Sequence, residues 1–271
     1  MKILITGSSG FVGRHLVKRL SKNHKIIRYD LVNGQDILDD KLLAKKLHGV
    51  DLVIHLAAFI SATESWEKPM EYFRNNTLGT ASVVKCAIET GVKKMIFFSS
   101  AAVKAKPLTP YAVSKINAEK ILELYKSKIV TVIVRPENIY GPGQKEAYGY
   151  VIHNFIKAVK SGKPVKIYGD GGQTRDFIYI DDVVNTIEKI IETEVKSGSE
   201  VSLGTGRETK IISLAKLIMK VVGKNAEIKF LPKRDEPTKS VADTKTLSLV
   251  NINTKKFINL EKGARKLISH L

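Results

Sequence analysis

Short apolar runs alternate with longer amphipathic segments through the first half of the chain. The runs are five or six residues long, and the segments between them carry apolar residues at every third or fourth position. A short apolar run predicts a buried strand, whereas the longer spacing predicts a helix. Because strands buried on both faces are typical of parallel sheets covered by helices, the pattern predicts a doubly wound α/β fold. The expected strands are residues 2–6, 26–30, 52–56, 94–98 and 130–135.

The alternation becomes less regular beyond residue 140, which indicates a second and smaller unit. We expect residues 1–140 to form the sheet domain and residues 141–271 a C-terminal lobe. Part of that lobe, about residues 176–206, is expected to return to the sheet. The other elements expected are a helix at 69–90, a turn at 169–172, a strand at 201–206, a helix from about 213 and a closing helix at 257–268.

Length and composition are those of an ordinary cytoplasmic enzyme. The 271 residues are enough for one large core and a smaller lobe. No apolar stretch reaches membrane-spanning length and the chain opens on a strand pattern, so we expect neither membrane attachment nor a signal peptide. The single cysteine, Cys86, excludes an intramolecular disulfide and fits a reducing compartment.

The formal net charge of +18 favours anionic partners. The lysines are scattered along the chain, however, and form no combined basic and aromatic platform of the kind that binds nucleic acid. We therefore expect no nucleic-acid partner. A positive field of this size would still attract a ligand that carries a diphosphate.

A glycine-rich turn, Gly-Ser-Ser-Gly-Phe-Val-Gly at residues 7–13, links the first strand to a helical pattern. Such a turn directs backbone N–H groups and a helix N-terminus at a diphosphate, which predicts a dinucleotide-binding domain of Rossmann type. The second strand ends in Asp30, whose carboxylate can accept both ribose hydroxyls and would repel a 2′-phosphate. The predicted cofactor is therefore NAD and not NADP. The alternative for Asp30 is a solvated loop acid.

Tyr111 and Lys115 are four residues apart, so they share one face of a helix. Thr109 can cap this helix and Pro110 suits its first position, which places Tyr111 in the first turn. A nearby ammonium and a helix N-terminus both favour the phenolate, so we expect a lowered pKa at Tyr111 and a role in acid–base chemistry. Alone, Tyr-x-x-x-Lys is an ordinary helix fragment, and the glycine-rich turn is what favours the catalytic interpretation.

Seven segments in order along the chain resemble the extended short-chain dehydrogenase/reductase family, of the NAD-dependent nucleotide-sugar epimerase/dehydratase type. Together they cover most of the sequence. The segments are residues 7–13, His-Leu-Ala-Ala at 55–58, Asn-Asn-Thr-Leu-Gly-Thr at 75–80, Ser-Ser-Ala-Ala-Val at 99–103, Tyr-Ala-Val-Ser-Lys at 111–115, Arg-Pro-Glu-Asn-Ile-Tyr-Gly-Pro-Gly at 135–143, and Gly-Asp-Gly-Gly-Gln-Thr-Arg-Asp-Phe-Ile-Tyr-Ile-Asp-Asp-Val at 169–183.

The resemblance implies a set of cofactor contacts in the sheet domain. Within this set, Asp36 and Ile37 resemble a pair that contacts adenine, although Asp36 can also begin the next helix. The cofactor-binding residues implied are Gly7, Ser9, Gly10, Phe11, Val12, Gly13, Asp30, Asp36, Ile37, Leu56, Ala57, Ala58, Asn76, Ser99, Tyr111 and Lys115.

The resemblance also implies the catalytic and substrate-binding residues. Ser100 would hydrogen-bond the reacting sugar oxygen, Tyr111 would act as the base or acid, and Lys115 would lower its pKa and hold the nicotinamide ribose. No metal ligand is implied. The nucleotide-diphosphate sugar, a UDP-sugar above all, would contact Asn138, Val151, Ile152, Tyr168, Arg175 and Arg234. The apolar members of this set can also be core residues.

The implied reaction is epimerisation at C4 through a transient 4-keto sugar, of the UDP-glucose/UDP-galactose type. Ala101 and Ala102 follow Ser100 and transfer no protons, which disfavours the elimination and decarboxylation reactions of other family members. One alternative is an NAD-dependent reductase or dehydrogenase of a nucleotide-linked keto sugar. The other is a non-catalytic relative that senses nucleotides or binds RNA, as the charge suggests.

The sequence departs from the family pattern at two places, and the resemblance also implies an oligomeric state. Only ten residues separate Ser100 from Tyr111, so the loop that borders the substrate in relatives is short here. Asp36 follows Asp30 by six residues, so the helix and strand that usually lie between these two positions are trimmed or missing. Relatives pair through the helix after Asn76 and the Tyr111 helix. The resemblance therefore implies a homodimer.

Overall fold

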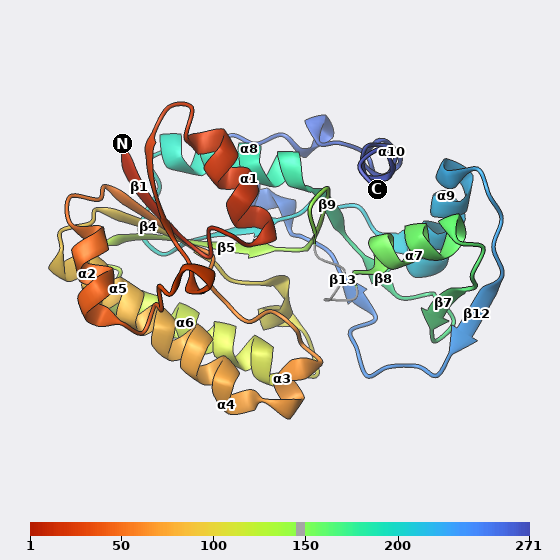
Figure 1. Cartoon of the computed structure of the whole chain (residues 1–271), viewed down its shortest axis with the longest axis horizontal. Helices are drawn as coiled ribbons and strands as arrows, with labels where there is room; N and C mark the ends of the chain where they lie inside the picture. Colours follow the sequence, from red (N-terminus) through yellow and green to blue (C-terminus); the bar gives the residue numbers. More distant parts are fainter. Residues whose placement is uncertain (145–149) are drawn as a thin grey trace.

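The computed structural model describes residues 1–144 and 150–271. Its centre is a six-stranded sheet in the order β10-β5-β4-β3-β1-β2, in which every neighbouring pair is parallel (Figure 1). The doubly wound α/β prediction is confirmed. The strands are β1 Lys2–Thr6, β2 Lys25–Tyr29, β3 Leu52–His55, β4 Lys94–Phe98, β5 Val130–Pro136 and β10 Ser199–Leu203.

Helices cover both faces of the sheet, with α1 and α8 on one side and α2, α5 and α6 on the other (Figure 1). Alternate residues of a strand point to opposite faces. In β1, Ile3 and Ile5 accordingly join the core under α1 and α8, whereas Leu4 joins the core under the other three helices. The helices are α1 Phe11–Leu20, α8 Ile180–Glu192, α2 Asp40–Leu47, α5 Gly79–Glu89 and α6 Pro110–Tyr125.

The helical stretch expected at 69–90 is continuous but not uniform. It begins with α4, Pro69–Tyr72, passes through a π-helical segment, Phe73–Leu78, and continues as α5. A short helix, α3 at Glu64–Glu67, precedes it. Segments of π-helix occur frequently at functional sites, and this one carries Asn76.

The chain between β2 and α2 is short, as expected. Only a 3₁₀ turn, Leu31–Asn33, intervenes before the residues that lead into α2. No strand pairs beyond β2 among the described residues, so β2 forms the edge of the sheet. The helix and strand that the family pattern would place here are absent from these residues.

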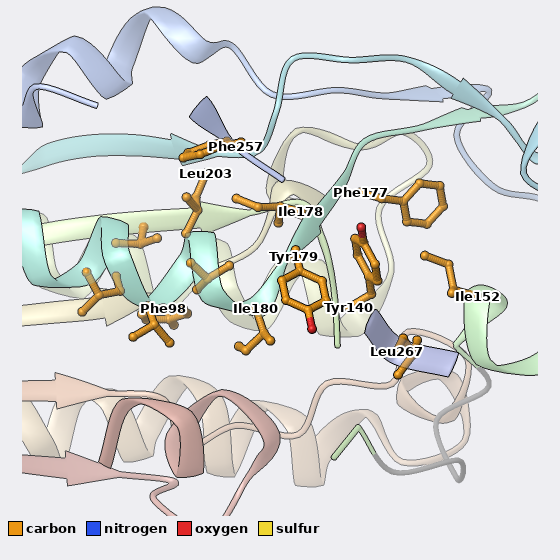
Figure 2. Close-up of a cluster of buried hydrophobic side chains, with 14 of the residues drawn as sticks. Phe98, Tyr140, Ile152, Phe177, Ile178, Tyr179, Ile180, Leu203, Phe257 and Leu267 are labelled. Atoms are coloured by element: carbon orange, nitrogen blue, oxygen red, sulfur yellow. The ribbon is translucent and has the colours of Figure 1, made fainter. Parts of the chain in front are cut away.

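The rest of the chain forms a lobe beside the carboxyl ends of the strands, and α8 and β10 return from it to the sheet. A buried cluster that includes Tyr140, Phe177 and Leu203 joins the two parts (Figure 2). No helix in the described residues is long and apolar enough to cross a membrane. The lobe contains α7 Val151–Lys160, α9 Ile211–Val222, α10 Leu260–Ile268, β6 Asn138–Tyr140, β7 Val165–Tyr168, β8 Thr174–Arg175, β9 Phe177–Tyr179, β11 Thr209–Lys210, β12 Ile228–Leu231 and β13 Lys239–Ser240.

Candidate active site

The glycine-rich turn between β1 and α1 is packed so closely that side chains are excluded. Gly7 has a φ of 66°, and a Cβ there would lie 2.8 Å from the backbone nitrogen of Ala57. A Cβ on Gly13 would lie 2.2 Å from the carbonyl oxygen of Gly7. No side chain caps α1, which begins directly after Gly10. The first N–H groups of this helix therefore need another partner, and an anionic diphosphate fits that need.

Asp30 lies beside this turn, where the sequence placed it. Its Oδ2 accepts a hydrogen bond from the N–H of Ser9 at 2.7 Å, and its Oδ1 accepts one from the N–H of Val32 at 3.1 Å. Two donors fix the carboxylate and leave lone pairs for the hydroxyls of a ribose. The turn and Asp30 together fit the diphosphate and the adenosine ribose of NAD.

Asp36 and Ile37 lie on the short connection from β2 to α2. Asp36 does not begin the helix, because α2 starts at Asp40 and is capped by Asp39. Its Oδ1 instead accepts the N–H of Leu38 at 2.9 Å. Ile37 is buried against Gly79 of α5, where a Cβ would come within 2.4 Å of its Cδ1. The side chain of Ile37 thus packs in the core, and its expected contact with adenine stays a prediction.

A buried polar chain connects β1, β3 and the π-helical segment beneath the predicted cofactor site. Thr6 contacts His55 Nδ1 at 2.7 Å, and His55 Nε2 contacts Thr80 at 3.0 Å. The Thr80 hydroxyl donates onward to the carbonyl of Asn76 at 2.7 Å, so His55 carries its proton on Nε2. Burial, together with the charge of Lys115, lowers the pKa of His55 to about 3 and keeps the ring neutral.

The loop that follows β3 is held by the same network. The hydroxyl oxygen of Thr6 accepts the N–H groups of Leu56 and Ala57, both at 3.2 Å, and Ala58 follows them. Asn76 fixes the next residue of the loop, because its amide both accepts the Phe59 N–H and donates to the Phe59 carbonyl at 2.9 Å.

Asn76 was expected near the cofactor, and the structure gives its side chain other partners. Besides Phe59, the amide donates to the hydroxyl of Ser114 on α6 at 3.0 Å, and only 1% of the residue is exposed. Asn76 therefore ties the loop after β3 to α6.

Tyr111 and Ser100 meet at the carboxyl end of β4. Thr109 caps α6 by accepting the N–H of Ala112 at 3.2 Å, which puts Tyr111 in the first turn, and Tyr111 is 8% exposed. The Ser100 hydroxyl accepts the N–H of Ala102 at 3.1 Å and lies beside the phenol. Burial raises the pKa of Tyr111 above its ordinary value, and the nearby Ser100 hydroxyl opposes that rise.

Lys115 lies one turn further along α6 and is 3% exposed. Its Nζ donates to the carbonyl of Phe98 at 2.7 Å and lies 4.8 Å from the centre of the Phe97 ring. Burial lowers the pKa of Lys115 to about 7, and Glu119 opposes this. The lowered pKa that the sequence predicted for Tyr111 is therefore not found, because burial raises the pKa of the phenol, and the role of Lys115 toward Tyr111 stays a prediction.

Ser99 was expected to contact the cofactor, but its hydroxyl donates to Glu119 Oε1 at 2.5 Å. The Glu119 carboxylate is also bound by Arg135, with Nε and Nη2 at 2.9 and 2.6 Å. Arg135 further contacts Glu200 on β10. The sequence reasoning did not single out Glu119, although its place one turn after Lys115 was a usable signal.

The two arginines expected to bind a sugar nucleotide have protein partners in this structure. The guanidinium of Arg234 stacks on the ring of Tyr168, 3.4 Å from its centre. Arg175 pairs with Glu236 at 2.6 Å and donates to the carbonyl of Pro237 at 2.8 Å. The two arginines, expected to converge on one diphosphate, are thus each engaged by a protein partner.

The other residues of this group divide between surface and core. Asn138 is exposed, and its amide donates to the carbonyl of Asp176 at 2.9 Å. Val151, at the start of α7, is half-buried. Ile152 is 2% exposed and belongs to the cluster of Figure 2, so its side chain is a core residue and not an open contact for a nucleobase.

Asp176 and Glu236 are two functional-looking residues that the sequence reasoning missed. Asp176 is fully buried and accepts the N–H groups of Thr205 and Gly206 at 3.0 and 2.8 Å, which ties β8 to the loop after β10. Asp176 directly follows Arg175, and Glu236 comes two residues after Arg234. A search for the charge partner of each arginine would have found Glu236.

Known proteins resemble this chain along nearly all of its length. The profile of the NAD dependent epimerase/dehydratase family matches residues 3–204. An uncharacterized UDP-glucose epimerase of Bacillus subtilis is 31% identical over 90% of this chain and 89% of that protein. A putative UDP-glucose 4-epimerase of Methanocaldococcus jannaschii is 31% identical over 98% and 97%.

The fold is shared with a solved UDP-glucose 4-epimerase of Thermotoga maritima bound to UDP-glucose. That structure superposes with a TM-score of 0.91 at 28% identity, over 100% of this chain and 98% of that chain. Similar proteins also include a dTDP-D-glucose 4,6-dehydratase and a UDP-glucuronic acid decarboxylase. The comparisons thus define a family whose members differ in reaction.

Proposed function

Because the chain belongs to the NAD dependent epimerase/dehydratase family, we propose that it interconverts the C4 epimers of a UDP-sugar, with UDP-glucose and UDP-galactose as the expected pair. The family is NAD-dependent, and the glycine-rich turn and Asp30 fit that cofactor. The observation that carries the proposal is the buried contact between Ser100 and Tyr111 beside two residues, Ala101 and Ala102, that transfer no protons.

Each residue of this cluster has a distinct task in the proposed reaction. Ser100 holds the C4 oxygen of the sugar by a hydrogen bond, and Tyr111 removes the hydroxyl proton and later returns it. Lys115 supports the ionised phenol electrostatically and holds the nicotinamide ribose. NAD held by the glycine-rich turn and Asp30 would supply the acceptor and donor of the C4 hydride in this reaction. Ala101 and Ala102 offer no acid or base for elimination at the neighbouring carbons.

The burial of Tyr111 supports this division of tasks. A buried phenol has a raised pKa, so its proton is retained until a positive charge enters the site. The positive charge of an oxidised nicotinamide and the ammonium of Lys115 both act in the required direction. An oxidised nicotinamide bound beside Tyr111 would therefore lower the pKa of the phenol.

Binding of the sugar nucleotide is proposed at the lobe. Arg175, Arg234 and Asn138 supply donors for a diphosphate, and guanidinium groups match phosphate oxygens in planar pairs. A diphosphate would have to replace Glu236 as the partner of Arg175. The half-buried ring of Tyr168 is the proposed stacking surface for the uracil.

The first test is a C4 isomerisation assay with the Tyr111→Phe variant. Purified protein is incubated with NAD and UDP-glucose or UDP-galactose, both isomers are resolved by chromatography, and NADH is followed by absorbance. We expect isomerisation without lasting NADH, and a loss of about 10²- to 10⁴-fold in kcat for the variant, the usual contribution of a general acid–base group.

Tyr125→Phe, at the far end of the same helix, is the matched control and should retain full activity. Lasting NADH formation without the C4 isomer would replace the epimerase proposal by an NAD-dependent dehydrogenase. Unchanged activity in Tyr111→Phe would reject the proposed role of the phenol.

The homodimer also stays a proposal, with support from the surface. Leu78, just before α5, is 57% exposed, and Leu124 on α6 is 78% exposed. Apolar side chains on the helices that are expected to pair gain most by being covered. Light scattering at micromolar concentration should give the mass of a dimer, and Leu124→Glu should lower it. A monomeric mass for the unaltered protein would reject the assembly.

A further inference from the structure

The last residues of β4 are held one by one by the helix that carries the proposed base. Residues 98–100 are consecutive at the carboxyl end of this strand and its exit, and each contacts a residue from a different turn of α6. The pairs are Ser100 with Tyr111, the carbonyl of Phe98 with Lys115, and the hydroxyl of Ser99 with Glu119. A shift of the helix along the strand would break all three contacts together.

Glu119 is the anchored member of this set. It is 9% exposed and both of its carboxylate oxygens are bound by Arg135, which projects from the neighbouring strand β5. Arg135 is in turn bound by Glu200 on β10. A buried two-point pair between an arginine and a carboxylate is directional, so it fixes the position of Glu119 relative to the sheet. Ser99 and α6 are then fixed through Glu119.

The same cluster also determines the charge next to Lys115. Glu119 lies one turn after Lys115 on α6, and it is the charged group of this cluster that acts on the lysine. Glu119 raises the pKa of Lys115 against the effect of burial.

The other groups that face Lys115 do not supply this charge. His55 on β3 is neutral because burial lowers its pKa to about 3. Tyr111 on α6 keeps its proton, since burial raises its pKa. On β4, the Phe97 ring and the Phe98 carbonyl are uncharged. Glu119 is thus the carboxylate, among the described residues, that opposes the loss of the lysine proton.

We propose that Glu119 is a positioning residue of the active site, which sets the register of α6 on the end of β4 through Ser99 and places a negative charge one turn from Lys115. Nothing in the chemistry requires Glu119 to touch the substrate or the cofactor. Its influence on turnover rests on the proposed epimerase function, whereas its influence on the lysine proton does not.

The decisive measurement is the titration of Lys115 in the full-length protein without substrate. Protein labelled with ¹³C at lysine Cε is titrated by NMR, and the Lys115 signal is assigned by its loss in Lys115→Met. In Glu119→Gln we expect the midpoint to fall by about one pH unit, the lower end of the effect of an adjacent opposite charge. Glu200→Gln removes the same charge from the same cluster at a more exposed site, and its midpoint should move by less than half as much.

Turnover supplies the second readout. In the C4 isomerisation assay, the alkaline fall of kcat in Glu119→Gln should move to lower pH by the same amount as the NMR midpoint. Ser99→Ala keeps the charge and removes the contact, so it should lower kcat about tenfold with no change in the Lys115 midpoint. Thermal unfolding of each variant shows whether it is folded. If Glu119→Gln does not fold, the activity of Ser99→Ala still tests the register, and the small Lys115 shift expected in Glu200→Gln still tests the charge.

An unchanged midpoint in Glu119→Gln, or equal shifts in Glu119→Gln and Glu200→Gln, would overturn the proposed electrostatic role. Full activity of Ser99→Ala would overturn the proposed register. Failure of the unaltered protein to isomerise any UDP-sugar would reject the proposed reaction alone, because the titration is made without substrate.

Discussion

The two halves of the candidate site are built in different ways. At the carboxyl ends of β3 and β4 the polar groups are buried and bonded to the protein itself, as with Lys115 at 3% exposure and Asn76 at 1%. In the lobe, Asn138 and Arg234 are exposed, and the ion pair of Arg175 with Glu236 is partly exposed, with side chains that are 13% and 36% exposed.

This difference indicates where each half obtains its geometry. A buried polar group is costly when it loses its partner, so the network around His55 and Asn76 can hold one arrangement only. An exposed ion pair contributes little and exchanges partners easily. The cofactor half is therefore preorganised, whereas the lobe can rearrange around its ligand.

The largest expected effect comes from breaking the preorganised half at Gly13→Ala. The new Cβ would lie 2.2 Å from the Gly7 carbonyl oxygen and 2.9 Å from Ser8, where only backbone can move. We expect the β1–α1 turn to open, a loss of several kcal/mol in the free energy of unfolding, comparable to overpacking a core, and no measurable NAD binding. Urea denaturation and calorimetric titration with NAD measure the two effects.

Gly91→Ala provides the matched control for this substitution. Gly91 has a φ of 78°, but a Cβ there meets nothing within 4 Å. It should cost about 1 kcal/mol through backbone strain alone and leave NAD affinity unchanged. Equal effects of the two substitutions would show that the close approach at Gly13 is not what shapes the site.

The same comparison explains which parts of the site could be predicted from sequence. The turn at 7–13, Asp30 and the Thr109 cap depend on local chemistry, that is on glycine, on a strand end and on a helix start. Each lies where the sequence placed it. Patterns that depend on a few neighbouring residues can be recognised in the amino-acid sequence alone.

The failures involve partners far apart in the chain. The pKa of Tyr111 depends on how deeply the folded chain buries it, and the contacts of Asn76 include Ser114, which is 38 residues away. Arg175 was expected to be open to a ligand and is held by Glu236, 61 residues further on. Burial and long-range pairing are properties of the folded chain, so residue type and spacing alone did not reveal them.

In the lobe, Arg175→Ala is expected to have an intermediate effect, on the binding of the UDP-sugar. If a diphosphate replaces Glu236 as the partner of Arg175, loss of the guanidinium removes charge-assisted hydrogen bonds worth about 1.5–3 kcal/mol. We expect the KM for the UDP-sugar to rise about 10- to 100-fold, with kcat changed less than threefold and NAD affinity unchanged. Steady-state isomerisation kinetics measure this.

Lys229→Ala on β12 is the control, because it removes one exposed positive charge from the same lobe. Its KM should change less than twofold. A loss of kcat in Arg175→Ala at constant KM would place Arg175 with the preorganised half and weaken the distinction drawn between the two halves.

The smallest effect is expected where the halves meet, at Glu137→Gln. Glu137 lines a cavity of about 320 Å³ between the end of β5 and the lobe segment 237–243, and its carboxylate accepts the Ser240 hydroxyl at 2.7 Å. Burial raises the pKa of Glu137 to about 7 from an ordinary value of 4.5. Glutamine keeps an acceptor for Ser240 and removes the cost of a buried charge.

The direction of the pH dependence follows from which state releases its proton first. As pH rises through 4.5 the unfolded chain ionises at this position, whereas the folded protein keeps the proton until about pH 7. The contribution of Glu137 to the free energy of unfolding therefore falls as pH rises from 4.5 to about 7, and it does not change further above pH 7.

Glu137→Gln should be more stable than the unaltered protein by about 1–3 kcal/mol at pH 8 and by almost nothing at pH 4. Urea denaturation at both pH values checks this, with the exposed Glu67→Gln as control. A gain that is equal at pH 4 and pH 8 would mean that packing, and not the buried charge, limits stability at this junction.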